Sequence, residues 1–493
     1  MFERNKRLIG WMLMLVVALA GCVTPAAPTL APMQTEAAPT PDQPTPTALP
    51  TRPPYPPGTL VEYTAQTGDT LKALAARFNT TVTEIREANP IIPDHVTTLP
   101  PGLPMQIPIY YQILWGSPYQ ILPDSQYGYG PAQVGFDAAA FVAAQPGWLK
   151  DYSLFIGGAT RRGGAIVDHI ATNFSINPKL LLAILEYQTG ALSQPEPLVN
   201  LDDYPLGYVE YMHTGLASQL TWAANYLNNG FYAWRNGNLT LFEFPDGRLE
   251  RPDPWQNAAT VALHYYFARV LSSDDYAIAI SSEGLEKTYR TLFGDGWVND
   301  PAPIPGSLEQ PALRLPFKLG QTWAYTGGPH TGWGEGEPFA AIDFAPSLVV
   351  GGCTVSPMDQ PVVAVADGVI ARTGDAIVVL DLDGDGLEQT GWVIFYLHLE
   401  NDFLPKVGTA VKAGDPIGYA SCDGGQATGT HVHIARKYNG EWIPAAGEPA
   451  LNMENWIARE GSAPYLGTLT RQGRVVQASD KSNLQSAIKS EAP

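Results

Sequence analysis

The sequence predicts a multidomain protein: a small βααβ domain, a mainly α-helical middle domain, and an all-β C-terminal domain with antiparallel sheets. Three observations support this prediction. The chain has 493 residues, which corresponds to about three domains. Between residues 110 and 305, apolar residues recur every three to four positions, as in amphipathic helices. From about residue 313, short apolar runs separated by Gly, Asp and Pro indicate strands and turns.

The overall charge excludes one class of function. The formal net charge is −19, and only 16% of the residues are charged. A nucleic-acid-binding surface needs clustered Lys and Arg to neutralise phosphates. We therefore expect no nucleic-acid partner.

The N-terminus has the pattern of an export signal. Three basic residues precede an apolar run at residues 8–20, which is too short for a comfortable membrane span. The run ends in Leu19-Ala20-Gly21-Cys22, which resembles the bacterial lipoprotein signal, cleaved before a cysteine that becomes lipid-modified. This resemblance makes residues 1–22 a signal peptide, Cys22 the lipidation site, and the protein lipid-anchored at the bacterial cell envelope, outside the cytoplasm. The alternative is an ordinary signal peptide with a chance cysteine.

Residues 23–58 are expected to form a disordered linker. They are mostly Pro, Thr, Ala and Gln, with almost no large apolar residue before Tyr55. Such a segment cannot bury enough apolar surface to fold. It would hold the folded part of the chain away from the membrane.

Residues 59–109 are expected to form the βααβ domain. A strand at 61–65 precedes a turn at Thr67-Gly68-Asp69-Thr70, where Asp69 or Thr70 can cap the following helix. A second helix ends near Asn89-Pro90, and residues 103–108 close the unit as a strand. Gly68-Asp69-Thr70-Leu71 and Asn89-Pro90 resemble a LysM domain, a family that binds glycans containing N-acetylglucosamine. The alternative is a small structural unit of the same order.

Residues 110–305 are expected to be mainly helical. Asn177 and Pro178 are a typical helix start, with Asn177 as the cap and Pro178 in the first turn. Apolar residues at helical spacing predict five helices, at residues 163–173, 178–187, 215–227, 255–271 and 284–293.

The segment 181–190 resembles the catalytic helix of lysozyme-like lytic transglycosylases. In that family a glutamate followed by serine ends the helix and acts as the general acid, whereas this chain has Gln188-Thr189. Glu186 is nearby, but two residues along a helix turn it about 200° away. Three interpretations stay open: a degenerate lysozyme-like domain, an active glycosidase that uses Glu186, and an unrelated helical spacer.

Residues 306–460 are expected to form the all-β domain, followed by a polar C-terminal tail at 461–493. Gly residues in the segments 366–369 and 411–418 can supply the backbone angles that turns require. The apolar runs predict strands at 362–366, 369–372, 376–380, 392–397, 416–420 and 431–436.

Histidines cluster in this domain. The chain has eight histidines, and His330, His398, His431 and His433 are four of them. Alternate residues of a strand point to the same face, so His431 and His433 would aim both imidazoles at one spot. Together with Asp343, these side chains are the usual ingredients of a catalytic zinc site with one open position.

These positions resemble the lysostaphin-type (LytM) zinc metalloendopeptidases over residues 313–446. Twelve residues separate His330 from Asp343, a gap that resembles the β-lytic branch of the family. The resemblance implies that His330, Asp343 and His433 bind zinc. It also implies that His398 and His431 flank the open coordination site, one handling the proton of the attacking water and the other stabilising the oxyanion.

Two further motifs of this domain have less specific interpretations. Cys353 and Cys422 are expected to form a disulfide, which export permits; metal ligation by these cysteines is the alternative. The segment 381–386, Asp-Leu-Asp-Gly-Asp-Gly, resembles the start of a calcium loop, but position twelve would be Trp392 instead of the chelating Glu. Because it lies between two predicted strands, a hairpin turn is favoured.

Together these features predict a zinc-dependent peptidoglycan hydrolase. The expected partner is peptidoglycan, with its glycan on the LysM domain and its peptide cross-links at the zinc site, and the only membrane contact is the lipid anchor. The main alternative is a non-catalytic wall-binding regulator or activator of another cell-wall hydrolase. A third hypothesis is glycan cleavage by the middle domain through Glu186.

Overall fold

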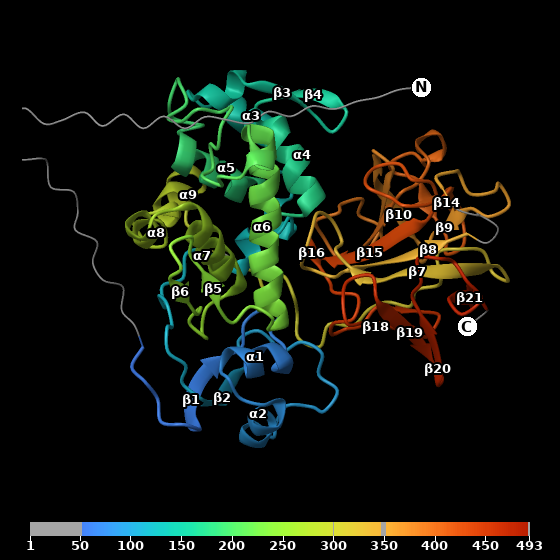
Figure 1. Ribbon diagram of the computed structural model, residues 1–493, viewed down its shortest axis with the longest axis horizontal. Helices are drawn as coiled ribbons and strands as arrows, with labels where there is room; N and C mark the ends of the chain where they lie inside the picture. The colour runs from blue at the N-terminus through green and yellow to red at the C-terminus, as the bar shows by residue number, and fades with distance from the viewer. Residues whose placement is uncertain (1–51, 299, 347–351, 492–493) are drawn as a thin grey trace, which may run out of the picture. The chain divides into compact units, whose positions relative to one another are not determined.

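The computed structural model describes residues 52–298, 300–346 and 352–491 (Figure 1). The predicted signal peptide, Cys22 and the linker up to residue 51 lie outside these described residues. Among the helices of the described ranges, none is both long and apolar enough to cross a membrane.

The first folded unit has the predicted βααβ order. Strand β1 (Thr59–Thr64) pairs antiparallel with β2 (Pro104–Ile109), and helices α1 (Leu71–Arg77) and α2 (Val82–Ala88) lie between them in sequence. Of the two expected caps for α1, Thr70 fills the role, because its side chain accepts a hydrogen bond from the Ala73 N–H. Asp69 instead lies buried and pairs with Arg77.

The middle region is built around the long helix α6 (Leu216–Asn236), drawn in green in Figure 1. All five predicted helices are present, and Asn177 caps α5 as expected, by accepting a hydrogen bond from the Lys179 N–H. Apart from α6, the described α-helices and strands of this region are α3 (Ala138–Ala143), α4 (Gly164–Phe174), α5 (Pro178–Thr189), α7 (Ala258–Val270), α8 (Ser273–Ala279), α9 (Leu285–Phe293), β3 (Ser153–Ile156), β4 (Ala159–Arg162), β5 (Phe242–Glu243) and β6 (Leu249–Glu250).

The C-terminal region is all-β, as predicted. Its main sheet has the strand order β13-β10-β11-β12-β15-β8-β7-β21, with β16 also paired to β15, and all of these pairs are antiparallel. The strands of this sheet are β7 (Thr322–His330), β8 (Ala341–Ala345), β10 (Gly368–Gly374), β11 (Ile377–Asp381), β12 (Trp392–Leu397), β13 (Ala410–Val411), β15 (Val432–Tyr438), β16 (Glu441–Trp442) and β21 (Ala487–Lys489).

The two faces of the main sheet belong to two different hydrophobic cores. In β12, Val393, Phe395 and Leu397 pack into the core that also holds the helices of the middle region. Ile394 and Tyr396 point to the opposite face, into a core made by the β-domain alone. This alternation follows from the two-residue repeat of a strand. One sheet face is therefore covered by the helical domain.

The segment 461–493, which the sequence marks as a polar tail, contributes strands to the β-domain. Strand β21 forms an edge of the main sheet by pairing with β7. Ile488 is fully buried in that strand, and Leu469 and Val476 are buried in the smaller sheet. These few apolar side chains anchor an otherwise polar segment. The remaining strands of the domain are β9 (Val362–Val363), β14 (Pro416–Gly418), β17 (Asn452–Met453), β18 (Trp456–Glu460), β19 (Gly467–Arg471) and β20 (Arg474–Gln477).

Candidate active site

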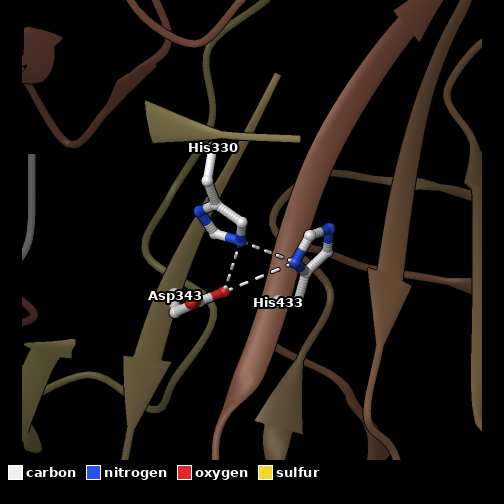
Figure 2. Close-up of side chains that lie close together, drawn as sticks. All are labelled: His330, Asp343 and His433. Atoms are coloured by element: carbon white, nitrogen blue, oxygen red, sulfur yellow. Dashed lines mark hydrogen bonds and ion pairs between the residues drawn. The ribbon is translucent and has the colours of Figure 1, made fainter. Parts of the chain in front are cut away.

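Three neighbouring strands of the main sheet bring His330, Asp343 and His433 together (Figure 2). His330 ends β7, Asp343 lies in the middle of β8, and His433 is the second residue of β15. Asp343 and His433 are direct register partners across the β8–β15 pair. All three side chains are buried, with exposed fractions of 3%, 6% and 5% respectively.

The donor atoms of these three residues form a tight triangle. His330 Nε2 lies 3.0 Å from His433 Nδ1. Asp343 Oδ1 lies 3.3 Å from His330 Nε2 and 3.4 Å from His433 Nδ1. In a tetrahedral zinc site with bonds of about 2.0–2.1 Å, ligand atoms lie about 3.3 Å apart. The triangle therefore has the dimensions of one face of such a site.

Backbone carbonyls fix which nitrogen of each ring carries the hydrogen. His330 Nδ1 lies 2.8 Å from the Gly328 carbonyl oxygen, and His433 Nε2 lies 3.1 Å from that of Gly332. A carbonyl oxygen only accepts, so each of these nitrogens must donate. The facing nitrogens then carry lone pairs, and Asp343 Oδ1 is a buried atom without a hydrogen-bond partner among the described residues. Three lone-pair donors directed at one point fit a bound cation.

The ionisation of the triad shows how strongly the three groups interact. Burial acts to lower the pKa of His330, but the adjacent Asp343 carboxylate and the Gly328 carbonyl together outweigh it, and the pKa is raised. Burial acts to raise the pKa of Asp343, yet His330 and then His431 hold it well below its usual value. The pKa of His433 is lowered, chiefly by burial. At neutral pH the carboxylate is therefore ionised and available to a cation.

His398 and His431 lie beside the triad, as expected from the sequence. Their ring centroids are 4.5 Å apart, and His431 Nε2 lies 3.8 Å from Asp343 Oδ1. The Nδ1 atoms of both rings lie 2.7 Å from carbonyl oxygens, those of Asp423 and Gly429. Each ring therefore keeps a lone pair on Nε2. Thus the structure gathers all five predicted side chains.

His398 has an unusual backbone conformation. It directly follows β12 and has a φ of +66°, a left-handed value that is uncommon for residues other than glycine. The backbone of Ser421 holds this residue, since the Ser421 N–H donates to the His398 carbonyl oxygen over 2.7 Å. Such strain is typical of functional positions.

A disulfide links Cys353 to Cys422, next to the residues that hold His398 and His431. Ser421 contacts both histidine segments, because its carbonyl oxygen accepts the His431 N–H over 3.3 Å. Cys422 connects Ser421 to Asp423, whose carbonyl oxygen is the partner of the His398 ring. The disulfide therefore constrains the segment that holds the two flanking histidines.

Tyr465 is a residue of the site that sequence reasoning missed. Its ring stacks on His330, with centroids 4.2 Å apart and an interplanar angle of 20°. The backbone of Tyr465 pairs with both Gly328 and Pro329, so it also holds the end of β7. Its neighbours Ser462-Ala463-Pro464 carry no motif, and only the tertiary structure places it here.

Two other groups singled out from the sequence have local roles. Asp381 ends β11, and Asp383 and Asp385 lie in the connection to β12, which pairs antiparallel with β11 as a hairpin requires. The three carboxylates also lie close enough together to hold an ion. Asp381 accepts hydrogen bonds from the Asp383 and Gly386 N–H groups. In the middle domain, Glu186 Oε2 accepts the N–H groups of Leu192 and Ser193, and thereby caps the turn that follows α5.

Three protein-family models match parts of the chain. Residues 63–108 match the LysM domain, residues 120–304 match the N-terminal domain of LasA, and residues 351–444 match peptidase family M23. His398, His431 and His433 lie within the third match, whereas His330 and Asp343 precede it. The strand pairing of β7, β8 and β15 brings these two residues to the matched segment.

The chain is also similar to individual proteins. It is 24% identical over 348 residues to Protease LasA of Pseudomonas aeruginosa (strain UCBPP-PA14), which covers 66% of this chain and 75% of that protein. It is 29% identical over 137 residues to the β-lytic metalloendopeptidase of Lysobacter enzymogenes, covering 26% and 71% respectively. The M23 metalloprotease pseudoalterin is 25% identical, covers 34% of this chain and 96% of that one, and has a TM-score of 0.29.

The family matches confirm two of the resemblances inferred from the sequence, those to LysM domains and to lysostaphin-type metalloendopeptidases. Metallopeptidases of family M23 depend on zinc, and the site described above has the donor set that this ion prefers. The chain carries a LysM domain followed, beyond the helical domain, by a LytM-type zinc metalloendopeptidase domain of peptidase family M23.

Proposed function

We propose that the protein is a peptidoglycan hydrolase that cleaves peptide cross-links of the bacterial cell wall. The LysM domain binds the glycan and keeps the peptidase near its substrate. The protein works outside the cytoplasm, held at the envelope by a lipid on Cys22. Cleavage of peptides is the chemistry of the metallopeptidase domain, and the LysM domain supports the cell wall as the location of the substrate.

One observation carries the enzymatic part of the proposal. Two imidazoles and a carboxylate converge on one point with two further imidazoles beside them, and one nitrogen of every ring faces a backbone carbonyl oxygen. Because a carbonyl oxygen only accepts, each neutral ring keeps a lone pair on its other nitrogen. Directed lone pairs suit metal binding and proton transfer.

In this proposal the five side chains divide into two groups. His330 Nε2, Asp343 Oδ1 and His433 Nδ1 hold the metal, since they form the buried triangle. Zinc bound there supplies a Lewis acid that polarises the scissile carbonyl and lowers the pKa of a water molecule to about 7. The Gly328 and Gly332 carbonyl oxygens orient the two ligand rings.

His398 and His431 handle protons beside the metal. The pKa of His398 is lowered to about 4, mainly by burial and also by His431, so the ring is neutral at pH 7. A neutral imidazole can accept the proton of the attacking water and return it to the leaving amine. His431, which is more exposed, is placed to stabilise the oxyanion of the tetrahedral intermediate when its Nε2 carries a proton.

The test compares wall digestion by the wild type and by His431→Ala. Purified zinc-loaded protein is incubated with peptidoglycan, and new amino groups are counted. We expect steady release by the wild type and a large loss of release by the variant. Equal release by both proteins would overturn the assignment of His431. No release by a zinc-loaded wild type would favour a non-catalytic wall-binding regulator.

Mass spectrometry of the released fragments identifies the bond that is cleaved. A glycyl–glycyl bond and a bond involving D-alanine and diaminopimelate leave fragments of different mass. New reducing or anhydro-sugar ends would indicate glycan cleavage by the middle domain. We expect none of them, because Glu186 is already used to cap backbone N–H groups.

A further inference from the structure

A polar stripe of helix α6 faces the peptidase domain. Asn225, Asn229, Tyr232 and Asn236 follow each other at spacings of four, three and four residues, which puts them on one side of the helix. The Tyr232 hydroxyl oxygen accepts the Trp442 N–H over 3.0 Å. The Asn236 amide donates to the Glu337 carboxylate over 3.2 Å. The helical domain therefore binds the peptidase domain through specific hydrogen bonds as well as through apolar packing.

Most of these contacts fall on one glycine-rich segment of the peptidase domain, residues 331–338, which we call the metal-site loop. The Glu335 N–H donates to Asn225 Oδ1 over 2.8 Å. Gly334 and Gly336 have φ values of +85° and +83° and lie directly against α6. A Cβ atom on Gly334 would overlap the Asn225 amide, and one on Gly336 would overlap the Asn229 amide. The loop is thus shaped to fit the helix.

The same loop directly holds a residue of the metal triad. It follows His330 in sequence, and its Gly332 carbonyl oxygen accepts the Nε2–H of His433 over 3.1 Å. That hydrogen bond turns His433 Nδ1 toward His330 and Asp343. Gly332 also packs against the ring of Trp442, whose backbone N–H is bonded to Tyr232 of α6. Two sets of contacts, one through Glu335 and one through Trp442, therefore connect α6 to the carbonyl that orients His433.

We propose that Asn225 of the helical domain is a positioning residue for the peptidase metal site. By holding Glu335, it fixes the metal-site loop and thereby the Gly332 carbonyl oxygen that orients His433. The helical domain then helps to position a metal ligand, in addition to contacting the LysM and peptidase domains. This inference rests on zinc binding at the triad, as proposed above.

Three single variants of the full-length protein test the inference. Asn225→Leu keeps the number and branching of the side-chain heavy atoms but removes the acceptor for the Glu335 N–H, whereas Asn225→Asp keeps an acceptor oxygen. Asn173→Leu is the matched control, because it removes an Asn acceptor at the same domain interface. Asn173 Oδ1 accepts from Arg372 Nη1 over 3.1 Å, and Arg372 lies in β10, away from the metal-site loop.

The main measurement is the zinc dissociation constant of the metal-free protein, obtained by competition with a chromophoric chelator. Loss of a partner that orients a metal ligand typically weakens metal binding 10–100-fold. Because Asn225 acts on such a partner and not on the ligand itself, we expect the zinc dissociation constant of Asn225→Leu to rise by about three- to tenfold. Asn225→Asp and Asn173→Leu should bind zinc like the wild type. The visible spectrum of the cobalt-substituted protein should change for Asn225→Leu alone, which reports the geometry of the ligands independently of activity.

The outcomes separate this inference from the proposed function. Equal zinc affinity and equal cobalt spectra for Asn225→Leu and the wild type would overturn the inference and leave the metal site intact. Equal weakening in Asn225→Leu and Asn173→Leu would also overturn it, because the cause would be general loosening of the interface. A wild type that binds no zinc would overturn both.

Discussion

His330 and His433 face each other with their Nε2 and Nδ1 atoms 3.0 Å apart, and neither atom has a hydrogen to donate when both rings are neutral. Such an arrangement is repulsive unless a cation or a proton lies between the rings. The Asp343 carboxylate, 3.3 Å and 3.4 Å from the two nitrogens, adds negative charge to the same point. The stability of the folded protein should therefore depend on whether a cation binds between these three atoms.

Removing the metal is expected to destabilise the protein. A ligand at 100 times its dissociation constant stabilises the folded state by about 2.7 kcal/mol. We therefore expect a chelator to lower the free energy of unfolding by about 3 kcal/mol relative to zinc-loaded protein. Asn at position 343 fills the same space but lacks the charge, so Asp343→Asn should show almost no response to zinc. Chemical denaturation with and without zinc measures both effects, and an unchanged zinc response in Asp343→Asn would contradict the assignment of this ligand.

Loss of either flanking histidine is expected to reduce catalysis while zinc binding persists. General acid–base groups contribute about 10²–10⁴-fold to the rate, so kcat should fall by that factor in His431→Ala and in His398→Asn. Asparagine is chosen for position 398 because it tolerates the positive φ of that residue. Zinc content is measured in parallel. A variant that lost its zinc would identify the histidine as a metal ligand instead.

Arg235 joins the three folded parts of the chain and should be important for their stability. Its guanidinium donates to the Thr67 carbonyl oxygen of the LysM domain. It also lies 3.1 Å from Asp124 of the helical domain and 3.0 Å from Glu441 of the peptidase domain. Arg235→Met would leave two buried carboxylates without their counter-charge, which typically costs about 3–5 kcal/mol.

The control for Arg235 is an ion pair on the protein surface. Arg290 pairs with Glu286 at 3.2 Å on α9, and the Arg290 side chain is 50% exposed. Because water screens such pairs, Arg290→Met should change the free energy of unfolding by less than about 1 kcal/mol. Urea unfolding measures both variants. Equal effects of the two substitutions would show that the three-domain junction is not a stabilising centre.

Much of the fold could be predicted because the sequence features that determine it lie within a few residues of one another. Thr70 and Asn177 cap their helices as expected, since capping depends only on residues a few positions apart. The convergence of His431 and His433 follows from the two-residue repeat of a strand. For α6 the local signal was misleading: the predicted helix ends at residue 227, where the weak helix formers Asn228, Asn229 and Gly230 begin, but the helix continues to Asn236.

Tertiary contacts explain why α6 continues and why the complete site could not be read from the sequence. Asn228 bonds the Phe174 carbonyl oxygen and the Tyr127 hydroxyl inside the core. A Cβ atom on Gly230 would lie 3.1 Å from the Ala262 Cα of α7, so glycine allows the two helices to pack closely. Similarly, Tyr465 reaches His330 only through the packing of distant strands. Pairing over long sequence distances has no local signature.

The pH dependence of stability should contain a contribution from His264 in the helical domain. This side chain is 1% exposed, and its Nε2 is buried without a hydrogen-bond partner in the part of the chain that the structure describes. Burial lowers its pKa to about 3, against about 6.5 in an unfolded chain. Between these values the unfolded state binds the proton and the folded state does not. Stability is therefore complete above pH 6.5 and is lost as the pH falls toward 3.

The size of this contribution can be measured by a difference between variants. At pH 5 the proton bound by the unfolded state costs the folded protein about 2 kcal/mol, and His264→Leu removes that cost. The advantage of His264→Leu over the wild type should therefore grow by about 2 kcal/mol between pH 7.5 and pH 5, as measured by urea unfolding. Other titrating groups cancel in this difference. The control is His95→Leu: His95 is exposed, so the stability difference between this variant and the wild type should not grow in the same way. Parallel pH profiles for wild type and His264→Leu would mean that the folded protein accommodates the charged ring.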